Sequence, residues 1–329
     1  EGRGSKAACA ALDGPKAASC ASGGGRGPRL PGRELCERLG EAAAIIDNGR
    51  DGLPPRTRVP PRLLAGYLGE RGHRVTVRHA MRYGEPSIGS VLDALKAEGA
   101  TRVLVLPTYP QYAAATTASA FDAVAAWAQR TRRVPELRFV GEYHDDVAYV
   151  DALARRVLDH WQAHGRGERL LLSFHGLPRR TLDRGDPYHC HCHKTARLLR
   201  ERLGLAEGAV VVTFQSRFGR ARWLEPYTEP TLRRLAAQGV QRVDVMCPGF
   251  VADCLETLEE IAQEAKAAFL AAGGREFHYI ECLNDRHEWI AALAALAIRH
   301  LQGWHTGEPA DAAALQSQRE RALAMGASD

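Results

Sequence analysis

A regular alternation of short apolar runs and longer helical patterns is the sequence feature that most constrains the fold. It begins near residue 60 and continues to residue 302. The apolar runs predict strands at 73–80, 102–107, 137–142, 169–174, 210–215, 242–247 and 277–282. The stretches between them predict helices at 87–96, 118–128, 147–164, 194–203, 229–238, 253–272 and 286–302. Strands and helices that alternate in this way form parallel sheets covered by helices on both faces.

The ends of these strands are where a site is expected. Right-handed crossovers bring the carboxyl ends of parallel strands to one edge of a sheet, and open α/β folds bind their ligands there. His175 follows an apolar strand, and a helix that opens at Asp253 follows another. A neutral imidazole can accept a proton near neutral pH, and carboxylates can hold a divalent cation. A structural histidine is the alternative reading of His175.

The helix that opens at Asp253 carries a row of carboxylates. Glu256, Glu260 and Glu264 are spaced by four residues, so they share one face of an α-helix. Such a row is suited to moving protons or a hydrated cation. A solvated helix face is the alternative for Glu260 and Glu264, and capping of the helix is the alternative for Asp253.

Composition excludes several classes of protein. The net charge of +5 is small for 329 residues and is spread along the chain, which argues against a nucleic-acid binder. The sequence contains no run of 18 apolar residues, so no membrane span is predicted. No leader pattern is visible, so a cytoplasmic location is expected. The eight cysteines are too scattered for a disulfide scaffold and are read as thiols or metal ligands.

The first part of the chain differs from the rest. Residues 1–33 contain no Val, Ile, Phe, Tyr, Trp or Met, so they cannot bury enough apolar surface to offset the entropy of ordering. The stretch that follows is rich in Arg, Pro and Gly and has one short apolar patch at 42–46. We expect residues 1–58 to be disordered or aberrant.

Several motifs in the region 79–282 resemble those of the ferrochelatases, enzymes that insert ferrous iron into a porphyrin. They occur in the family's order and include Ser173-Phe174-His175-Gly176 and the run from Cys247 to Glu260. The others are Ala80-Met81-Arg82-Tyr83-Gly84, Leu106-Pro107-Thr108-Tyr109-Pro110-Gln111-Tyr112 with Thr116-Thr117, Thr213-Phe214-Gln215-Ser216-Arg217-Phe218-Gly219, and Trp223-Leu224-Glu225-Pro226-Tyr227-Thr228. So many motifs in one order make a specific signal.

The resemblance implies roles for particular residues. His175 and Glu256 would act on opposite sides of the macrocycle, as catalytic residues and metal contacts, and Glu260, Glu264 and Asp253 would form a path for protons or metal. A further set would line the porphyrin pocket: Arg82, Tyr83, Tyr109, Tyr112, Ser216, Arg217 and Trp223. Arg82 can pair with a propionate, with a surface salt bridge as the alternative. Core packing is the alternative for the two tyrosines of the 106–112 motif. Ser216 and Arg217 can also orient the acidic helix.

The segment 188–193 places two cysteines and three histidines in six residues, which are ligand types for zinc or an iron–sulfur cluster. Some ferrochelatases carry a [2Fe–2S] cluster on four cysteines. In one branch of the family, one of these cysteines lies in the region where this chain has Ala113 and Ala114, and the others lie in the C-terminal tail. The tail of this chain after Gly303 has no cysteine. We therefore expect no cluster and no required organic cofactor, with Fe²⁺ as a substrate. Whether Cys190 or Cys192 binds metal stays open.

The resemblance predicts the whole arrangement. Two doubly wound, Rossmann-like α/β domains of similar topology are expected at 59–164 and 165–303, with the porphyrin in the cleft between them and a polar tail at 304–329. The function implied is insertion of Fe²⁺ into protoporphyrin IX to make protohaem, in the cytoplasm. Because the porphyrin is hydrophobic, peripheral membrane contact stays open.

One departure from the family pattern bears on this prediction. Ferrochelatases begin with an apolar strand that leads into a lip over the porphyrin, and residues 1–60 do not match it convincingly. The first domain is therefore expected to be incomplete and to lack a central strand. Two alternatives follow. One is a chelatase for coproporphyrin or another metal, and the other is a non-catalytic protein that binds a tetrapyrrole or metal.

Overall fold

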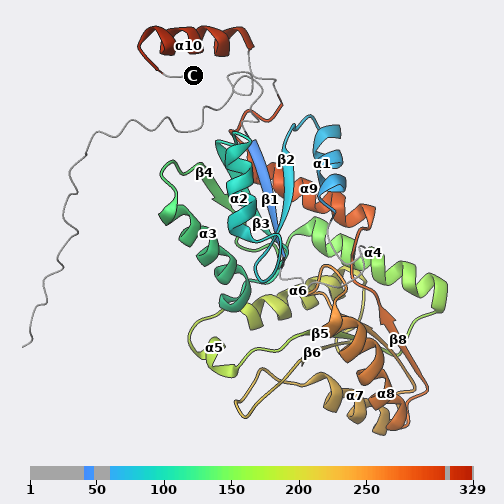
Figure 1. Cartoon of the computed structure of the whole chain (residues 1–329). Coiled ribbons are helices and arrows are strands. Elements are labelled where there is room, and N and C mark those ends of the chain that lie inside the picture. Colours follow the sequence, from blue (N-terminus) through green and yellow to red (C-terminus); the bar gives the residue numbers. More distant parts are fainter. Residues whose placement is uncertain (1–40, 48–59, 308–311, 328–329) are drawn as a thin grey trace, which may run out of the picture.

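Two parallel sheets of four strands each form the framework of the protein (Figure 1). The structure is a computed structural model that describes residues 41–47, 60–307 and 312–327. The first sheet has the order β2-β1-β3-β4, and the second has the order β6-β5-β7-β8. The strands are β1 (Glu41–Asp47), β2 (Thr76–Met81), β3 (Arg102–Pro107), β4 (Glu136–Phe139), β5 (Arg169–His175), β6 (Val210–Gln215), β7 (Arg242–Met246) and β8 (Glu276–Ile280). The two sheets therefore share one topology, which confirms the predicted fold class.

Helices connect the strands and cover the sheets. In the described residues these are α1 (Pro61–Glu70), α2 (Ile88–Ala97), η2 (Ala114–Ala118), α3 (Ser119–Arg130), α4 (Val147–His164), α5 (Arg179–Asp183), α6 (Tyr188–Arg202), α7 (Thr228–Ala237), η3 (Glu256–Ala265), α8 (Lys266–Ala271), α9 (His287–Leu301) and α10 (Ala312–Ala324). Each of the predicted strands and helices has a counterpart within a few residues, although α6 begins six residues before the predicted start at 194. Helix α10 lies in the segment that was expected to be a polar tail.

The first sheet has its central strand, contrary to the sequence-based expectation. Strand β1 lies between β2 and β3, and its register pairs Ala44 with Arg78 on one side and with Val105 on the other. The prediction that residues 1–58 form no structure is thus wrong for Glu41–Asp47. Three alanines in this strand give it low β-propensity, which hid it. The rest of that segment, and any lip at 48–59, lies outside the described residues.

Strands β3 and β5 show how the cores are built. Leu104 and Leu106 of β3 belong to the largest buried cluster, whereas Val103 and Val105 belong to a second cluster that also contains side chains of α2 and α3. In β5, Leu170, Leu172 and Phe174 join the largest cluster, and Leu171 faces a third one. Successive side chains point to opposite faces of a strand, so both strands are buried on both sides, as parallel sheets require.

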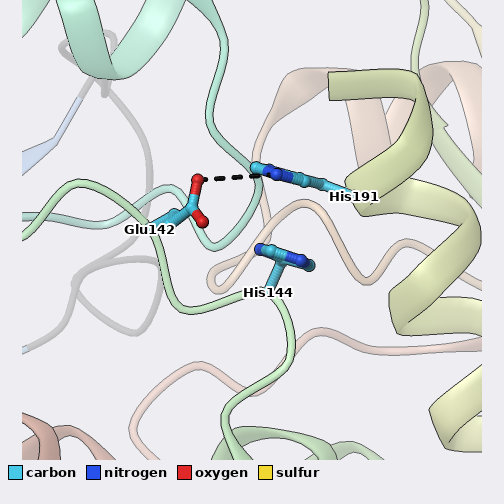
Figure 2. A group of neighbouring side chains, drawn as sticks. All are labelled: Glu142, His144 and His191. Carbon is cyan, nitrogen blue, oxygen red and sulfur yellow. Dashed lines mark ion pairs between the residues drawn. The ribbon is translucent and has the colours of Figure 1, made fainter. Parts of the chain in front are cut away.

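The largest cluster joins the two halves of the molecule. It contains residues of β3, β5, α4 and α9, and α9 also packs against α1, which precedes β2. Helix α6 of the second half contacts α4, and its His191 lies against Glu142 and His144 of the loop that follows β4 (Figure 2). Domain boundaries at residues 164 and 303 stay predictions. No helix in the described part of the chain is both long and apolar enough to cross a membrane.

Candidate functional site

His175 stands at the carboxyl end of β5, at the edge where a site was expected. The strand before it is almost wholly buried, while the imidazole is only partly covered. Its Nδ1 lies 2.6 Å from the carbonyl oxygen of Gly176. Because a carbonyl can only accept, Nδ1 carries the hydrogen of the neutral ring, and the lone pair is on Nε2. His175 therefore presents Nε2 to accept a proton or bind a metal ion.

The turn after His175 needs a residue without a side chain. A Cβ atom on Gly176 would lie 2.7 Å from the carbonyl oxygen of Gln215 and 3.1 Å from the ring of Trp223. The backbone of β5 thus passes close to β6 at this point, and the two strands pair His175 directly with Gln215.

Gln215 connects three strands to the acidic helix. Its amide oxygen accepts from the Ser173 hydroxyl at 2.7 Å and from the Cys247 thiol at 3.5 Å. Its amide nitrogen donates to the backbone carbonyl of Glu256 at 3.1 Å. The side chain is buried, with 3% of its surface exposed. One residue therefore holds the start of the acidic helix against the strand end that carries His175.

The acidic helix begins as a π-helix, whereas an α-helix was predicted over 253–272. Its turns are closed by i→i+5 hydrogen bonds from Glu256 to Ala265, and α-helical geometry returns in α8. The apolar pattern correctly predicted a helix. A pattern of this length does not distinguish a π-helix, which has about one more residue per turn, from an α-helix. π-helical turns occur frequently at functional sites.

The three glutamates of this helix lie in different surroundings. Glu256 and Glu260 are partly buried, and Glu264 is exposed. The Glu260 carboxylate accepts from both the backbone N–H and the hydroxyl of Ser216, each at 2.6 Å. Ser216 has a φ of 64°, which is rare for a residue other than glycine. Glu260 thus holds the loop after β6 in a strained conformation.

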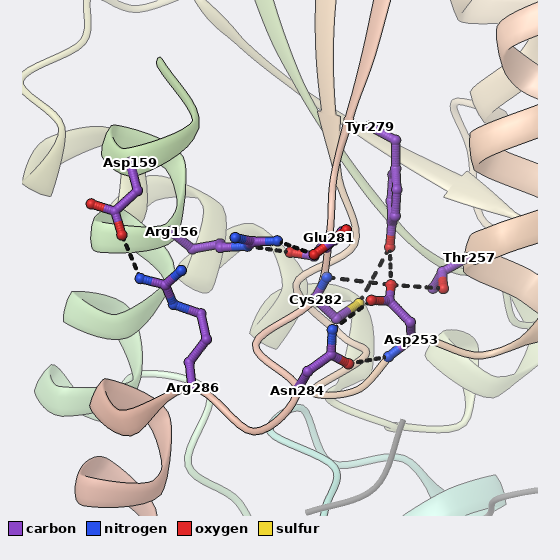
Figure 3. Close-up of polar contacts among 9 residues, drawn as sticks. All are labelled: Arg156, Asp159, Asp253, Thr257, Tyr279, Glu281, Cys282, Asn284 and Arg286. Carbon is purple, nitrogen blue, oxygen red and sulfur yellow. Dashed lines mark hydrogen bonds and ion pairs between the residues drawn. The ribbon is translucent and has the colours of Figure 1, made fainter. Parts of the chain in front are cut away.

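Asp253 is the centre of a buried hydrogen-bond network (Figure 3). Its carboxylate accepts from the Tyr279 hydroxyl and the Asn284 amide, both at 2.6 Å. It also accepts from the Thr257 hydroxyl at 3.1 Å and the Cys282 N–H at 3.3 Å. Leu255, not Asp253, occupies the position before the π-helix. Asp253 therefore anchors the loop after β8 to the π-helix, with both carboxylate oxygens engaged.

Burial favours the protonated form of the thiols near the acidic helix. Burial, and then the neighbouring Glu256 carboxylate, raise the pKa of the Cys254 thiol. Burial also raises the pKa of the Cys247 and Cys282 thiols well above the ordinary value. Because a metal is bound by the thiolate form, the raised pKa values favour the interpretation that these cysteines are apolar packing residues.

The carboxyl edges of the two sheets meet at Gln111, in the loop after β3. Its amide nitrogen donates to the Thr195 hydroxyl of α6 at 3.0 Å, and a Cβ on Gly249 would lie 3.4 Å from its amide oxygen. The Tyr149 hydroxyl donates to the Pro248 carbonyl at 2.6 Å. The loop after β3 therefore lies against the loop that leads from β7 into the acidic helix.

The predicted pocket residues of the first half follow β2 and β3. Arg82 donates from Nε to the carbonyl and the hydroxyl of Ser119, both at 2.8 Å, and its guanidinium carbon lies 4.5 Å from the centre of the Tyr83 ring. Tyr83 is 56% exposed, whereas Tyr109 and Tyr112 are partly buried. Arg82 is thus held at a fixed position beside an exposed aromatic ring.

The predicted pocket residues of the second half differ in exposure. Arg217 is exposed and lies over the ring of Tyr227, with its guanidinium carbon 5.0 Å from the ring centre. Trp223 is buried between Gly176 and the exposed Phe218, whose ring centre is 4.8 Å away. Trp223 therefore packs against Gly176, at the turn that follows His175.

Gln215 is the residue whose role sequence reasoning missed. It stands inside a motif that was recognised, and a buried polar side chain at the end of an apolar strand is a signal in itself.

Cys190 and Cys192 lie two positions apart on α6, where Cys190 is exposed and Cys192 is buried. Residues at that spacing do not face each other on a helix, so the two side chains point to different faces of α6.

Comparisons with known proteins identify the family of this chain. A family model described as Ferrochelatase matches residues 39–301. A protein named ferrochelatase from Methylibium petroleiphilum is 71% identical over 266 residues, which are 81% of this chain and 73% of the relative. One with the same name from Polaromonas sp. is 66% identical over 265 residues, 80% of this chain and 72% of the relative.

Solved structures share the fold at low sequence identity. SirB from Bacillus subtilis with Fe³⁺ has a TM-score of 0.59 at 16% identity and covers 82% of this chain and 100% of its own. The sirohydrochlorin chelatase SirB from B. subtilis subspecies spizizenii in complex with cobalt has a TM-score of 0.51 at 17% identity, covering 80% of this chain and 98% of its own.

Proposed function

The chain belongs to the ferrochelatase family, and from this premise we propose that it inserts Fe²⁺ into protoporphyrin IX to make protohaem. It is a metal chelatase of the lyase class. One ferrous ion replaces the two pyrrole N–H hydrogens, which leave as protons. The protein must therefore accept protons from the macrocycle and replace the water that surrounds the ion.

The observation that carries the proposal is the connection of His175 to Glu256 through Gln215. His175 pairs with Gln215 across two strands, and Gln215 donates to the Glu256 carbonyl. The strand end that carries His175 and the backbone of Glu256 thus share a support that is buried and hydrogen-bonded. A backbone held in this way favours proton transfer and ion binding, because it need not reorganise when the substrates arrive.

We assign proton acceptance or metal contact to Nε2 of His175, because Nδ1 is engaged with Gly176. The complementary role on the opposite face of the macrocycle is assigned to Glu256, whose carboxylate is close enough to raise the pKa of Cys254. Glu264 is exposed and would be the entry of a path for protons or metal that leads to Glu256. Glu260 and Asp253 would act as positioning residues, because their carboxylates already accept several hydrogen bonds.

Porphyrin binding is assigned to the first half of the molecule together with the loop after β6. The Arg82 guanidinium would pair with a propionate, since Arg binds carboxylates through two parallel N–H bonds. Tyr83, Tyr109 and Tyr112 would pack on the macrocycle, and Arg217 and Ser216 border it from the other half. Trp223 would act indirectly, through the turn at Gly176.

No organic cofactor is needed for this reaction, and iron is its substrate. The cytoplasm is the proposed compartment, supported by buried thiols at Cys192, Cys247 and Cys282 that are free cysteines, as is typical of reducing compartments. Peripheral contact with a membrane would give access to the hydrophobic porphyrin.

An anaerobic assay tests the proposal. Wild type, His175→Ala and Glu256→Ala would be incubated with Fe²⁺ or Zn²⁺ and protoporphyrin IX, and the metalloporphyrin would be followed by absorbance. Turnover by wild type that is lost in both variants supports the function. Porphyrin binding without turnover by wild type would instead indicate a binding protein, and turnover that survives in His175→Ala would refute the role of the imidazole.

A further inference from the structure

Three potential metal ligands converge where the two halves of the molecule meet (Figure 2). Glu142 and His144 lie in the loop between β4 and α4, and His191 lies on α6. One ligand atom of each residue lies within 4.8 Å of the others. The distance from Nε2 of His191 to the Glu142 carboxylate is 3.5 Å. None of these residues belongs to the motifs that carry the proposed function.

The two imidazoles lie face to face. Their rings are stacked with an interplanar angle of 7° and centres 3.6 Å apart, an arrangement that two cationic rings would not adopt. A metal ion binds an imidazole through the lone pair of an unprotonated ring nitrogen.

A second observation points to a ligand at this position. The His144 side chain is 3% exposed, and its Nδ1 is buried without a hydrogen-bond partner among the described residues. Burying a polar atom without a partner is costly. The carbonyl of the same residue is engaged, because it accepts from the Thr195 hydroxyl at 2.7 Å. The loop is therefore held in place while the ring nitrogen stays unsatisfied.

We propose that Glu142, His144 and His191 form a binding site for a divalent transition-metal ion, with Zn²⁺ as the representative. Two imidazoles and one carboxylate are a common donor set for such ions and leave positions open for water. Ligand atoms of a tetrahedral zinc site are about 3.3 Å apart, given bonds of about 2.0 Å. The ligand atoms lie up to 4.8 Å apart, so they must close by up to about 1.5 Å. The rings must also turn out of their stack, because their lone pairs lie in the ring planes.

Binding at this site is coupled to the loop that carries Tyr112. Nδ1 of His191 accepts from the Tyr112 N–H at 3.3 Å, so the hydrogen of the neutral ring is on Nε2, which faces Glu142. An ion bound at Nε2 takes the place of that hydrogen, which moves to Nδ1. Nδ1 then no longer accepts from Tyr112. Occupancy of the site is thus expected to change the backbone at a residue of the predicted porphyrin pocket.

Co²⁺ is a suitable probe because its visible absorption reports the ligand type. Full-length protein would be titrated with Co²⁺ by equilibrium dialysis and absorbance, in a background that carries both His175→Ala and Glu256→Ala, so that the two proposed metal contacts of the chelatase edge are removed. We expect one equivalent to bind, and we expect Glu142→Gln and His191→Asn each to weaken that binding at least tenfold. His193→Asn is the matched control, because His193 is exposed on the same helix.

Three results would overturn the proposal. These are unchanged binding in both Glu142→Gln and His191→Asn, equal loss in His193→Asn, or a thiolate-to-cobalt charge-transfer band that places the ion on Cys190. Glu142 is exposed, so Glu142→Gln keeps the test valid if a histidine variant fails to fold. The site does not depend on the proposed function, since chelatase turnover and Co²⁺ binding are measured separately.

Discussion

The two halves of the molecule have the same sheet topology but different side chains at the corresponding strand ends. Strand β6 occupies in the second sheet the place that β2 occupies in the first. It ends in Gln215, which bonds to three neighbours, whereas β2 ends in the fully buried Met81. The titratable groups of the proposed reaction follow the second sheet, and an arginine and tyrosines follow the first. A shared fold thus leaves chemistry to a few residues at its edge.

Removing the proposed base of the second half should have the largest effect on kcat. His175→Ala deletes the proposed proton acceptor, and general-base catalysis typically contributes about 10²–10⁴-fold to a rate. We expect kcat to fall by about that factor in an anaerobic assay while the KM for porphyrin changes by less than about threefold. His193→Ala, an exposed histidine of the same half, serves as the control and should retain the wild-type kcat. A fall in the kcat of His193→Ala would show that the loss in His175→Ala is not specific to the proposed base.

Exchanging the two strand ends tests whether Gln215 makes the halves different. Gln215→Met leaves the Cys247 thiol and the Glu256 carbonyl without this partner, and an unsatisfied buried group costs about 1–3 kcal/mol. We expect a loss of about 2 kcal/mol in urea unfolding and a fall in kcat of about tenfold. The matched exchange Met81→Gln buries an amide and should lower stability while keeping kcat. Equal kcat in the two variants would contradict the role assigned to Gln215.

The loop after β6 permits a finer test. Ser216→Ala loses the hydroxyl that donates to Glu260 and retains a side chain at a φ of 64°. Ser216→Gly also loses the hydroxyl but suits this φ and retains the backbone N–H. We expect Ala to cost about 1 kcal/mol in thermal unfolding and Gly to be the more stable variant. The reverse order would mean that the Ser216 backbone is unstrained.

A first-half variant should give a smaller effect of a different kind. Arg82→Lys keeps the charge and loses the planar pair of donors that suits a carboxylate. We expect the KM for protoporphyrin to rise about three- to tenfold, which corresponds to about 1 kcal/mol. Porphyrin binding measured by fluorescence quenching should weaken by the same factor. An unchanged KM would show that Arg82 does not bind a propionate.

The strands and helices were predictable where their patterns were long and regular. The alternation from residue 73 to residue 302 has a counterpart at every element. The clearest strands, β3 and β5, are buried on both faces and are therefore nearly continuous apolar runs. Strand β1 was missed because Ala-rich sequence between charged neighbours does not look like a strand. Its place in the sheet depends on pairing with β2 and β3, which are distant in the sequence.

The assignment of His175 and Glu256 to the site stays a prediction from the motifs, and only part of the local geometry was predictable. The alternating pattern predicted that both residues follow strand ends. The sequence offered Ser216 as a residue that orients the acidic helix, and its bonds to Glu260 agree with that alternative. The sequence does not show which carboxylate Ser216 binds, or that Asp253 is enclosed by Tyr279 and Asn284. Those contacts connect separate segments of the chain. The π-helical hydrogen bonding of η3 was likewise not visible, since α- and π-helices accept similar apolar patterns.

The most direct test of the account is one steady-state experiment that compares Glu256→Gln with Arg82→Lys under anaerobic conditions. Both would be assayed with Fe²⁺ across a range of protoporphyrin concentrations. If chemistry lies in the second half and porphyrin binding in the first, Glu256→Gln lowers kcat by about 10²-fold or more with little change in KM. Arg82→Lys then raises KM and leaves kcat unchanged. A fall in kcat of equal size in both variants would contradict the division of roles between the two sheets.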